Sequence, residues 1–137
     1  LIFSITVSED ANLEAVDGQS AGAAMAVLLA SVIQGKTINS DVVITGTVTP
    51  ENEIGSVGMV YEKAIAAGNS GAEVFLVPKG QAVVNVENCD ERTEGSVFYR
   101  TCQVETKPLN PITENQFAMK TVEVSYLDEA LSFFHKK

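Results

Sequence analysis

A serine between two glycines is the first feature that could carry chemistry. The segment Asp17-Gly18-Gln19-Ser20-Ala21-Gly22 lies at the start of a long apolar run. The glycines leave space for a substrate backbone, and the N–H groups at a helix N-terminus would stabilise an oxyanion. Ser20 is therefore a candidate nucleophile. In the alternative interpretation Ser20 only caps the helix and Gly18 only turns the chain.

Lys63 is a candidate partner for this serine. It lies in the first turn of a predicted helix whose neighbouring positions are apolar, and a lysine there opposes the helix dipole. A lysine in apolar surroundings can give up its proton and serve as the general base for a serine. The alternative is an exposed surface lysine without a catalytic role.

The order and spacing of four motifs resemble the proteolytic domain of the Lon protease family. The first is the Asp-Gly-x-Ser-Ala-Gly segment around Ser20, and the second is Thr45-Gly46 at a strand end. The third is the lysine motif that ends in Glu62-Lys63, 43 residues after the serine, and the fourth is Pro78-Lys79 after the next strand. The resemblance covers residues 5–79 and the closing strand and helix.

The resemblance implies a serine endopeptidase that cleaves polypeptides through an acyl-enzyme, with Ser20 as nucleophile and Lys63 as base. Gly18 and Thr45 would support the site, with Thr45 hydrogen-bonded to Lys63. Asp17 would order the loop or pair with Lys63 in the unliganded enzyme, unless it only forms a turn. The resemblance also implies polypeptide substrates and no cofactor in this chain. It is compatible with assembly into a homo-oligomeric ring.

A non-proteolytic Lon-like module for assembly or peptide binding is the alternative function. Modules of that kind have usually lost the serine and the lysine. Both Ser20 and Lys63 are present here, which favours the peptidase.

Two other features are weaker candidates, one for phosphate binding and one for a histidine base. Gly35-Lys36-Thr37 matches the end of a phosphate-binding loop, but the first glycine of that motif would fall at Ala30, and the segment follows a helix instead of opening one. A glycine helix cap with Lys36 near the helix C-terminus explains it better. His135, at the chain end, is expected to be solvated, so a serine would need another base.

The apolar patterns predict one α/β domain over residues 1–137, with helices packed on a mixed sheet. The apolar run 20–34 predicts a helix that is apolar on nearly all sides and so central to the fold. The remaining elements are bounded by turn residues. We expect strands at 1–8, 41–48, 54–57, 74–77 and 121–125, and helices at 60–67 and 128–134.

From 80 to 118 no hydrophobic periodicity holds, and we expect a long irregular insertion there. It contains the only cysteines, Cys89 and Cys102, which we predict to form a disulfide. A disulfide would indicate an oxidising compartment, whereas free thiols would indicate the cytosol. With one histidine in the chain, the ligands for a zinc site are too few, and no metal is predicted.

The start of the chain and its long insertion depart from the family pattern. Leu1 opens directly into a strand pattern, so we expect a fragment of a longer protein. An ATPase segment, a signal or an anchor would then lie outside this chain. These features look more like the ATPase-less archaeal relatives of Lon, some of which are secreted or membrane-anchored. We therefore favour those locations slightly over the cytoplasm.

Composition excludes several other classes of function. The 137 residues include nine Lys and Arg against eighteen Asp and Glu, a net charge of −9, and 45% are hydrophobic. An acidic chain repels a phosphate backbone, so nucleic acid is not an expected partner. The apolar run 21–33 would span only about 20 Å as a helix, against roughly 30 Å of bilayer hydrocarbon. It predicts a buried helix and not a membrane span.

Overall fold

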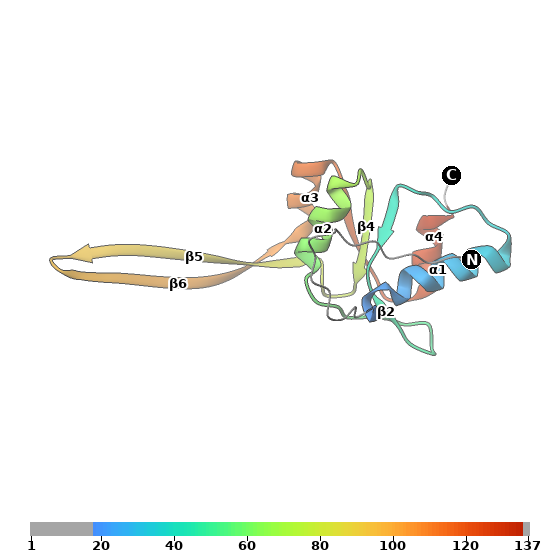
Figure 1. Ribbon diagram of the computed structural model, residues 1–137, viewed down its shortest axis with the longest axis horizontal. Coiled ribbons are helices and arrows are strands. Elements are labelled where there is room, and N and C mark those ends of the chain that lie inside the picture. The colour runs from blue at the N-terminus through green and yellow to red at the C-terminus, as the bar shows by residue number, and fades with distance from the viewer. Residues whose placement is uncertain (1–17, 136–137) are drawn as a thin grey trace, which may run out of the picture.

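The computed structural model describes residues 18–135, which form helices on both sides of a small parallel sheet (Figure 1). The predicted strand 1–8 and Asp17 lie outside the described residues. The predicted mixed α/β fold is confirmed. The elements are η1 (Gln19–Ala21), α1 (Gly22–Gln34), β1 (Val42–Ile44), β2 (Thr47–Val48), β3 (Ile54–Gly55), α2 (Val60–Asn69), β4 (Val74–Pro78), β5 (Val83–Glu94), β6 (Val97–Pro108), α3 (Leu109–Phe117), β7 (Lys120–Val124) and α4 (Leu127–Phe134).

Strand β4 carries the core on both of its faces. It lies between β1 and β7 and runs parallel to both. Leu76 packs with α1 and α4 on one face, while Phe75 and Val77 pack with α2 and α3 on the other. All three side chains are at most 1% exposed. A strand buried on both faces has a continuous apolar sequence, which made β4 predictable.

Helix α1 is less central than predicted. Its buried side chains are Ala23, Val27 and Ser31. On its other face, Leu29 is 51% exposed and Ile33 is 76% exposed. For the described part of the chain the prediction of a helix buried on nearly all sides is therefore wrong, because α4, β1 and β2 cover one side of α1. No helix within residues 18–135 is both long and apolar enough to cross a membrane.

The predicted strand 41–48 is interrupted at Thr45 and Gly46. β1 ends before this break, and β2 begins after it and pairs antiparallel with β3. At the break, the Gly46 N–H donates to Ser20 O at 3.0 Å, and the Gly46 C=O accepts the Ala23 N–H at 3.0 Å. The main chain leaves the sheet here because Gly46 pairs with the start of α1 instead of with a strand.

The segment predicted to be irregular, 80–118, instead contains a β-hairpin and a helix. β5 and β6 have twelve residues each and pair antiparallel along their whole length, and α3 follows directly. We call residues 83–108 the arm and the other described residues the body; Figure 1 shows the arm extending far from the body. Both faces of the arm meet solvent along most of its length, so its sequence lacks the apolar alternation of a half-buried strand.

A disulfide joins the two strands of the arm halfway along their length. Cys89 and Cys102 lie directly opposite each other in the strand register and are bonded to each other. Gly95, in the left-handed region with a φ of 61°, begins the two-residue turn at the tip. The arm therefore has a defined register fixed at its turn and at its middle.

Candidate active site

Ser20 lies in a short turn ahead of α1 and not at the N-cap of a helix. The N-cap of η1 is Gly18 and that of α1 is Ala21, and neither makes a side-chain capping hydrogen bond. The Ala21 N–H donates to Gly18 O at 2.9 Å, which closes the turn. Ser20 itself is half-buried. The alternative in which Ser20 serves only as a helix cap is therefore wrong, and Gly18 contributes through its main chain.

The strand end at Thr45 and Gly46 holds the Ser20 main chain in place. The Gly46 N–H and the Thr45 hydroxyl both donate to the Ser20 carbonyl oxygen, at 3.0 and 3.5 Å. A Cβ at position 46 would lie 2.6 Å from Cγ2 of Ile54, so this close approach requires glycine. The Thr45 hydroxyl, predicted to bond Lys63, donates to Ser20 instead.

Lys63 reaches the same site from helix α2. Its N–H donates to Met59 O at 3.1 Å, and Met59 is the N-cap of the helix, with a left-handed φ of 56°. Lys63 is half-buried, in contrast to the exposed lysine of the alternative interpretation. The ion pairs found within residues 18–135 lie in the arm, so no described carboxylate pairs with the Lys63 amine.

Ser20 and Lys63 together line two cavities. One has a volume of about 320 Å³ and is walled by residues 56–59 and Thr47. The other, of about 390 Å³, is mostly apolar, with alanines of α1 and α2 and the ring of Phe75 in its lining, and Thr45 also contributes. A hydroxyl, an amine and adjoining space for a bound chain are what acyl transfer by a serine requires.

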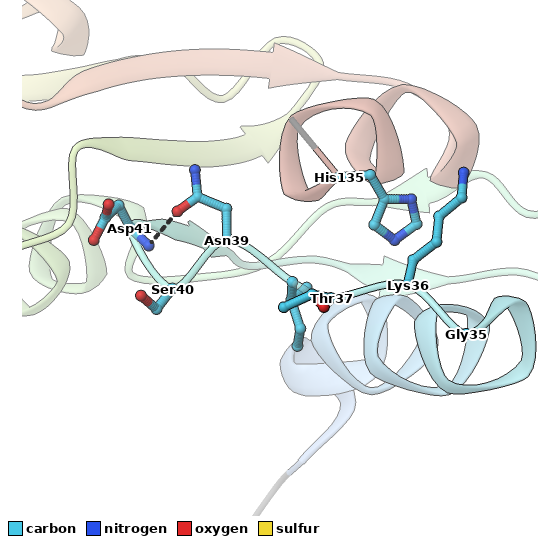
Figure 2. Close-up of a pocket in the computed structure, with 8 residues that line it drawn as sticks. Gly35, Lys36, Thr37, Asn39, Ser40, Asp41 and His135 are labelled. Atoms are coloured by element: carbon cyan, nitrogen blue, oxygen red, sulfur yellow. Dashed lines mark hydrogen bonds between the residues drawn. The ribbon is translucent and has the colours of Figure 1, made fainter. Parts of the chain in front are cut away.

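A larger cavity, of about 850 Å³, lies at the C-terminal end of α1 (Figure 2). The segment 35–41 and His135 line it. Gly35 has a left-handed φ of 63°, and its N–H donates to Val32 O at 3.1 Å. The predicted glycine cap is thus confirmed, and the segment Gly35-Lys36-Thr37 ends a helix.

His135 is not the solvated residue that its position predicts. It is half-buried, with Nε2 2.8 Å from Oγ of Ser31. Ser31 is buried, and its hydroxyl donates to Val27 O at 2.7 Å. With the single hydroxyl proton of Ser31 on the Val27 carbonyl oxygen, the imidazole N–H of His135 donates to Ser31 Oγ. This pair ties the end of α1 to the end of α4 and does not form a nucleophile and its base.

Within residues 18–135, one group of three side chains has the spacing of a metal site. It consists of Glu87, Cys89 and Cys102 in the arm. Because the two sulfurs are bonded to each other, neither is available as a thiolate ligand.

The fold and the site define a mixed α/β domain in which a serine ahead of one helix and a lysine of another line the same cavities. The family model for the Lon protease (S16) C-terminal proteolytic domain matches residues 5–105. The chain belongs to this family, which confirms the resemblance found in its motifs.

Named relatives agree with this assignment. The chain is 42% identical over 62 residues to Lon protease 2 of Syntrophobacter fumaroxidans, 34% over 77 residues to Lon protease 1 of Herpetosiphon aurantiacus, and 28% over 105 residues to the peroxisomal Lon protease homolog 2 of Rattus norvegicus. These alignments cover 45, 56 and 77% of this chain. They cover only 8, 9 and 12% of the relatives, which are much longer proteins.

Sequence analysis missed one residue at this site. The side-chain amide of Gln81 hydrogen-bonds the main chain of Val57, which lines the smaller cavity with Ser20 and Lys63. A glutamine after a strand end carries no local pattern, because its role depends on a contact across 24 residues of sequence. Only the folded chain brings the two together.

Proposed function

We propose that this chain is a serine peptidase domain that cleaves polypeptides with a Ser20–Lys63 dyad. The observation that carries the proposal is that this serine and this lysine, from separate elements, line the same two cavities. Membership of the Lon proteolytic-domain family supports a peptide bond as the substrate. The half-burial of both residues supports a site from which a bound chain excludes water.

In the first half of the reaction, Oγ of Ser20 attacks the carbonyl carbon of the scissile bond. The neutral Lys63 amine accepts the hydroxyl proton as the new C–O bond forms. Main-chain N–H groups around Ser20 bind the oxyanion. The C–N bond then breaks, Lys63 returns the proton to the leaving nitrogen, and an ester on Ser20 remains.

In the second half, water attacks the ester carbonyl and Lys63 accepts one of its protons. The C–O bond to Ser20 breaks, Oγ recovers a proton from Lys63, and the product leaves as a carboxylic acid, which ionises. Throughout, Thr45 and Gly46 fix the Ser20 main chain, so the nucleophile stays oriented in both steps.

Incubation with unfolded casein tests the proposal. Ser20→Ala is expected to abolish cleavage, while Ser132→Ala, at an exposed serine of α4, is the matched control and is expected to cleave at the parent rate. Because Ser20 does not cap a helix, its loss should change the free energy of unfolding by less than about 0.5 kcal/mol. Cleavage by purified Ser20→Ala would refute Ser20 as nucleophile.

The same experiment separates the peptidase from a non-proteolytic module for assembly or peptide binding. Such a module would bind casein without cleaving it, and Ser20→Ala would change neither result. A peptidase instead yields fragments whose appearance depends on Ser20.

Partners and location follow from the same family assignment and from the charge. We expect polypeptide substrates and not nucleic acid, because the net charge is −9. Self-association into a ring can be measured by light scattering. The Cys89–Cys102 disulfide supports an oxidising compartment, consistent with a secreted or membrane-anchored protein.

A further inference from the structure

The side chain of Gln81 holds the main chain of Val57 at two points. The Val57 N–H donates to Oε1 of Gln81 at 2.9 Å, and Nε2 of Gln81 donates to the Val57 carbonyl oxygen at 2.7 Å. A primary amide that both donates to and accepts from one residue satisfies the main-chain N–H and C=O of that residue, as a neighbouring strand would. Gln81 thus acts as a two-point clamp on this residue.

Val57 lies in the loop 56–59, which lines the smaller cavity together with Ser20 and Lys63. Ser56, Gly58 and Met59 are exposed, so within this loop only Val57 packs against the core. Met59 adopts a left-handed backbone conformation, which is unfavourable for residues other than glycine. Such a conformation persists only when surrounding contacts determine it. The clamp on Val57 supplies two of those contacts.

The loop also determines where Lys63 stands. Met59 is the N-cap of α2, and its carbonyl oxygen accepts the N–H of Lys63 at 3.1 Å. A shift of the loop at Val57 would therefore move the beginning of α2. The Lys63 main chain would move with it, relative to Ser20 in η1.

Gln81 is itself well anchored. Its N–H donates to Pro78 O at 3.0 Å, at the end of the buried strand β4. The next N–H, of Ala82, donates to Oε1 of Glu123 on β7 at 3.1 Å. The clamp thus connects the loop 56–59 to two strands of the central sheet.

We propose that Gln81 is a positioning residue for the dyad: it fixes the loop 56–59, and through Met59 the start of α2, so that Lys63 stays aligned with Ser20. This role rests on the proposed peptidase function. It concerns the alignment of the two catalytic groups, so it should affect kcat for a short peptide more than KM.

Two variants and one control test this role. Gln81→Met keeps most of the side-chain volume and removes both hydrogen bonds, and Gln81→Ala removes the side chain. Asn85→Ala is the matched control, because Oδ1 of Asn85 also accepts a hydrogen bond, from Thr106 at 2.9 Å, but inside the arm. Steady-state cleavage of a short peptide, hydrogen exchange at the Val57 amide and the thermal midpoint are measured for each.

For Gln81→Met and Gln81→Ala we expect kcat to fall by about tenfold or more, since a displaced catalytic group loses rate steeply. The Val57 amide, which loses its acceptor, should exchange about tenfold faster or more. Asn85→Ala should match the parent protein in both measurements. The thermal midpoint of Gln81→Met should stay close to that of the parent, which separates misalignment from unfolding.

The outcomes also separate this role from the proposed function. If Ser20→Ala is inactive but Gln81→Met keeps the parent kcat or the parent Val57 exchange rate, the role of Gln81 is wrong and the dyad stands. A rise in KM alone would likewise refute alignment as its role. If Ser20→Ala still cleaves, the proposed function is wrong, and the role of Gln81 in it is refuted as well.

Discussion

In the body, the central strand β4 has Leu76 and Val77 at 0% exposure and is covered by helices on both faces. In the arm, every residue of β6 is exposed, and each strand pairs only with the other within the described residues. The body can rely on apolar burial, whereas a two-stranded ribbon in water is marginal without further support. In the arm the Cys89–Cys102 disulfide supplies that support.

Charged contacts along the arm do not replace burial. Arg92 lies 3.9 Å from Glu94 and Arg100 lies 4.0 Å from Glu91, and all four side chains are more than half exposed. Exposed ion pairs of this kind contribute about 0–1 kcal/mol each. Body and arm should therefore respond differently to substitution. Substitutions in the body should lower its stability or activity. Substitutions in the arm should disturb only the structure of the arm itself.

The largest expected effect is on catalysis, in the body. Lys63→Arg should reduce peptide cleavage by about a hundredfold or more, because a guanidinium keeps its proton and cannot accept that of Ser20. The charge is retained, so a merely electrostatic role of Lys63 would be preserved. Cleavage rates of the purified variant measure the effect.

Lys79→Arg, at an exposed lysine after β4, is the matched control and should cleave at the parent rate. A Lys63→Arg protein that retains a sizeable fraction of the parent rate would show that Lys63 is not the base. The site would then need a base outside the pair described here.

Next in size is an effect on stability that separates the core from the arm. Leu76→Ala should lower the free energy of unfolding by about 3 kcal/mol, through lost burial and a residual cavity. Phe98→Ala, in β6 and 60% exposed, should lower it by less than about 0.5 kcal/mol. Urea unfolding followed by circular dichroism compares the two. Equal losses would mean that the arm packs as a core does.

The same difference in burial explains which elements could be predicted from the sequence. β4 was predicted within one residue because a strand buried on both faces is continuously apolar. β7, which mixes β-branched residues with exposed charged ones, was also predicted within one residue. The arm was missed because Val104 at 69% exposure and Phe98 at 60% do not face a core, so no alternation marks its strands. Its turn did leave a local signal in Gly95-Ser96, a pair typical of two-residue hairpins.

In the candidate site, predictability depended on whether a residue's role is local. Ser20 and Lys63 belong to recognisable motifs, and the structure brings both to the same cavities. The partner of Thr45 was mispredicted, since the direction of a hydroxyl bond depends on tertiary packing. Gln81 carried no motif, because its two hydrogen bonds exist only when the folded chain brings the segment after β4 to Val57.

A smaller, local effect should follow from breaking the disulfide. Alkylation of the native, unreduced protein should find no free thiol at Cys89 or Cys102. Replacing both by serine should speed hydrogen exchange throughout the arm, since a cross-link closing a loop of this size stabilises by about 3 kcal/mol in the chain-entropy model. Exchange in β4 should not change. Faster exchange at Leu76 would show instead that the arm and body unfold together.

The smallest expected effect comes from shortening the arm. Deleting residues 87–92 together with 99–104 removes six paired positions and the disulfide but keeps Val86 opposite Glu105 and the turn at Gly95. An even number of residues is removed from each strand, so every remaining side chain keeps its face. Because the clamp at Gln81 and both cavities lie in the body, cleavage of a short peptide should stay within about twofold of the parent rate, as expected for distant, independent sites. Intact casein, assayed beside the peptide, then shows whether the arm contributes to long substrates. A large loss with the short peptide would contradict the separation of arm and body, because it would mean that order in the arm is transmitted to Ser20 and Lys63.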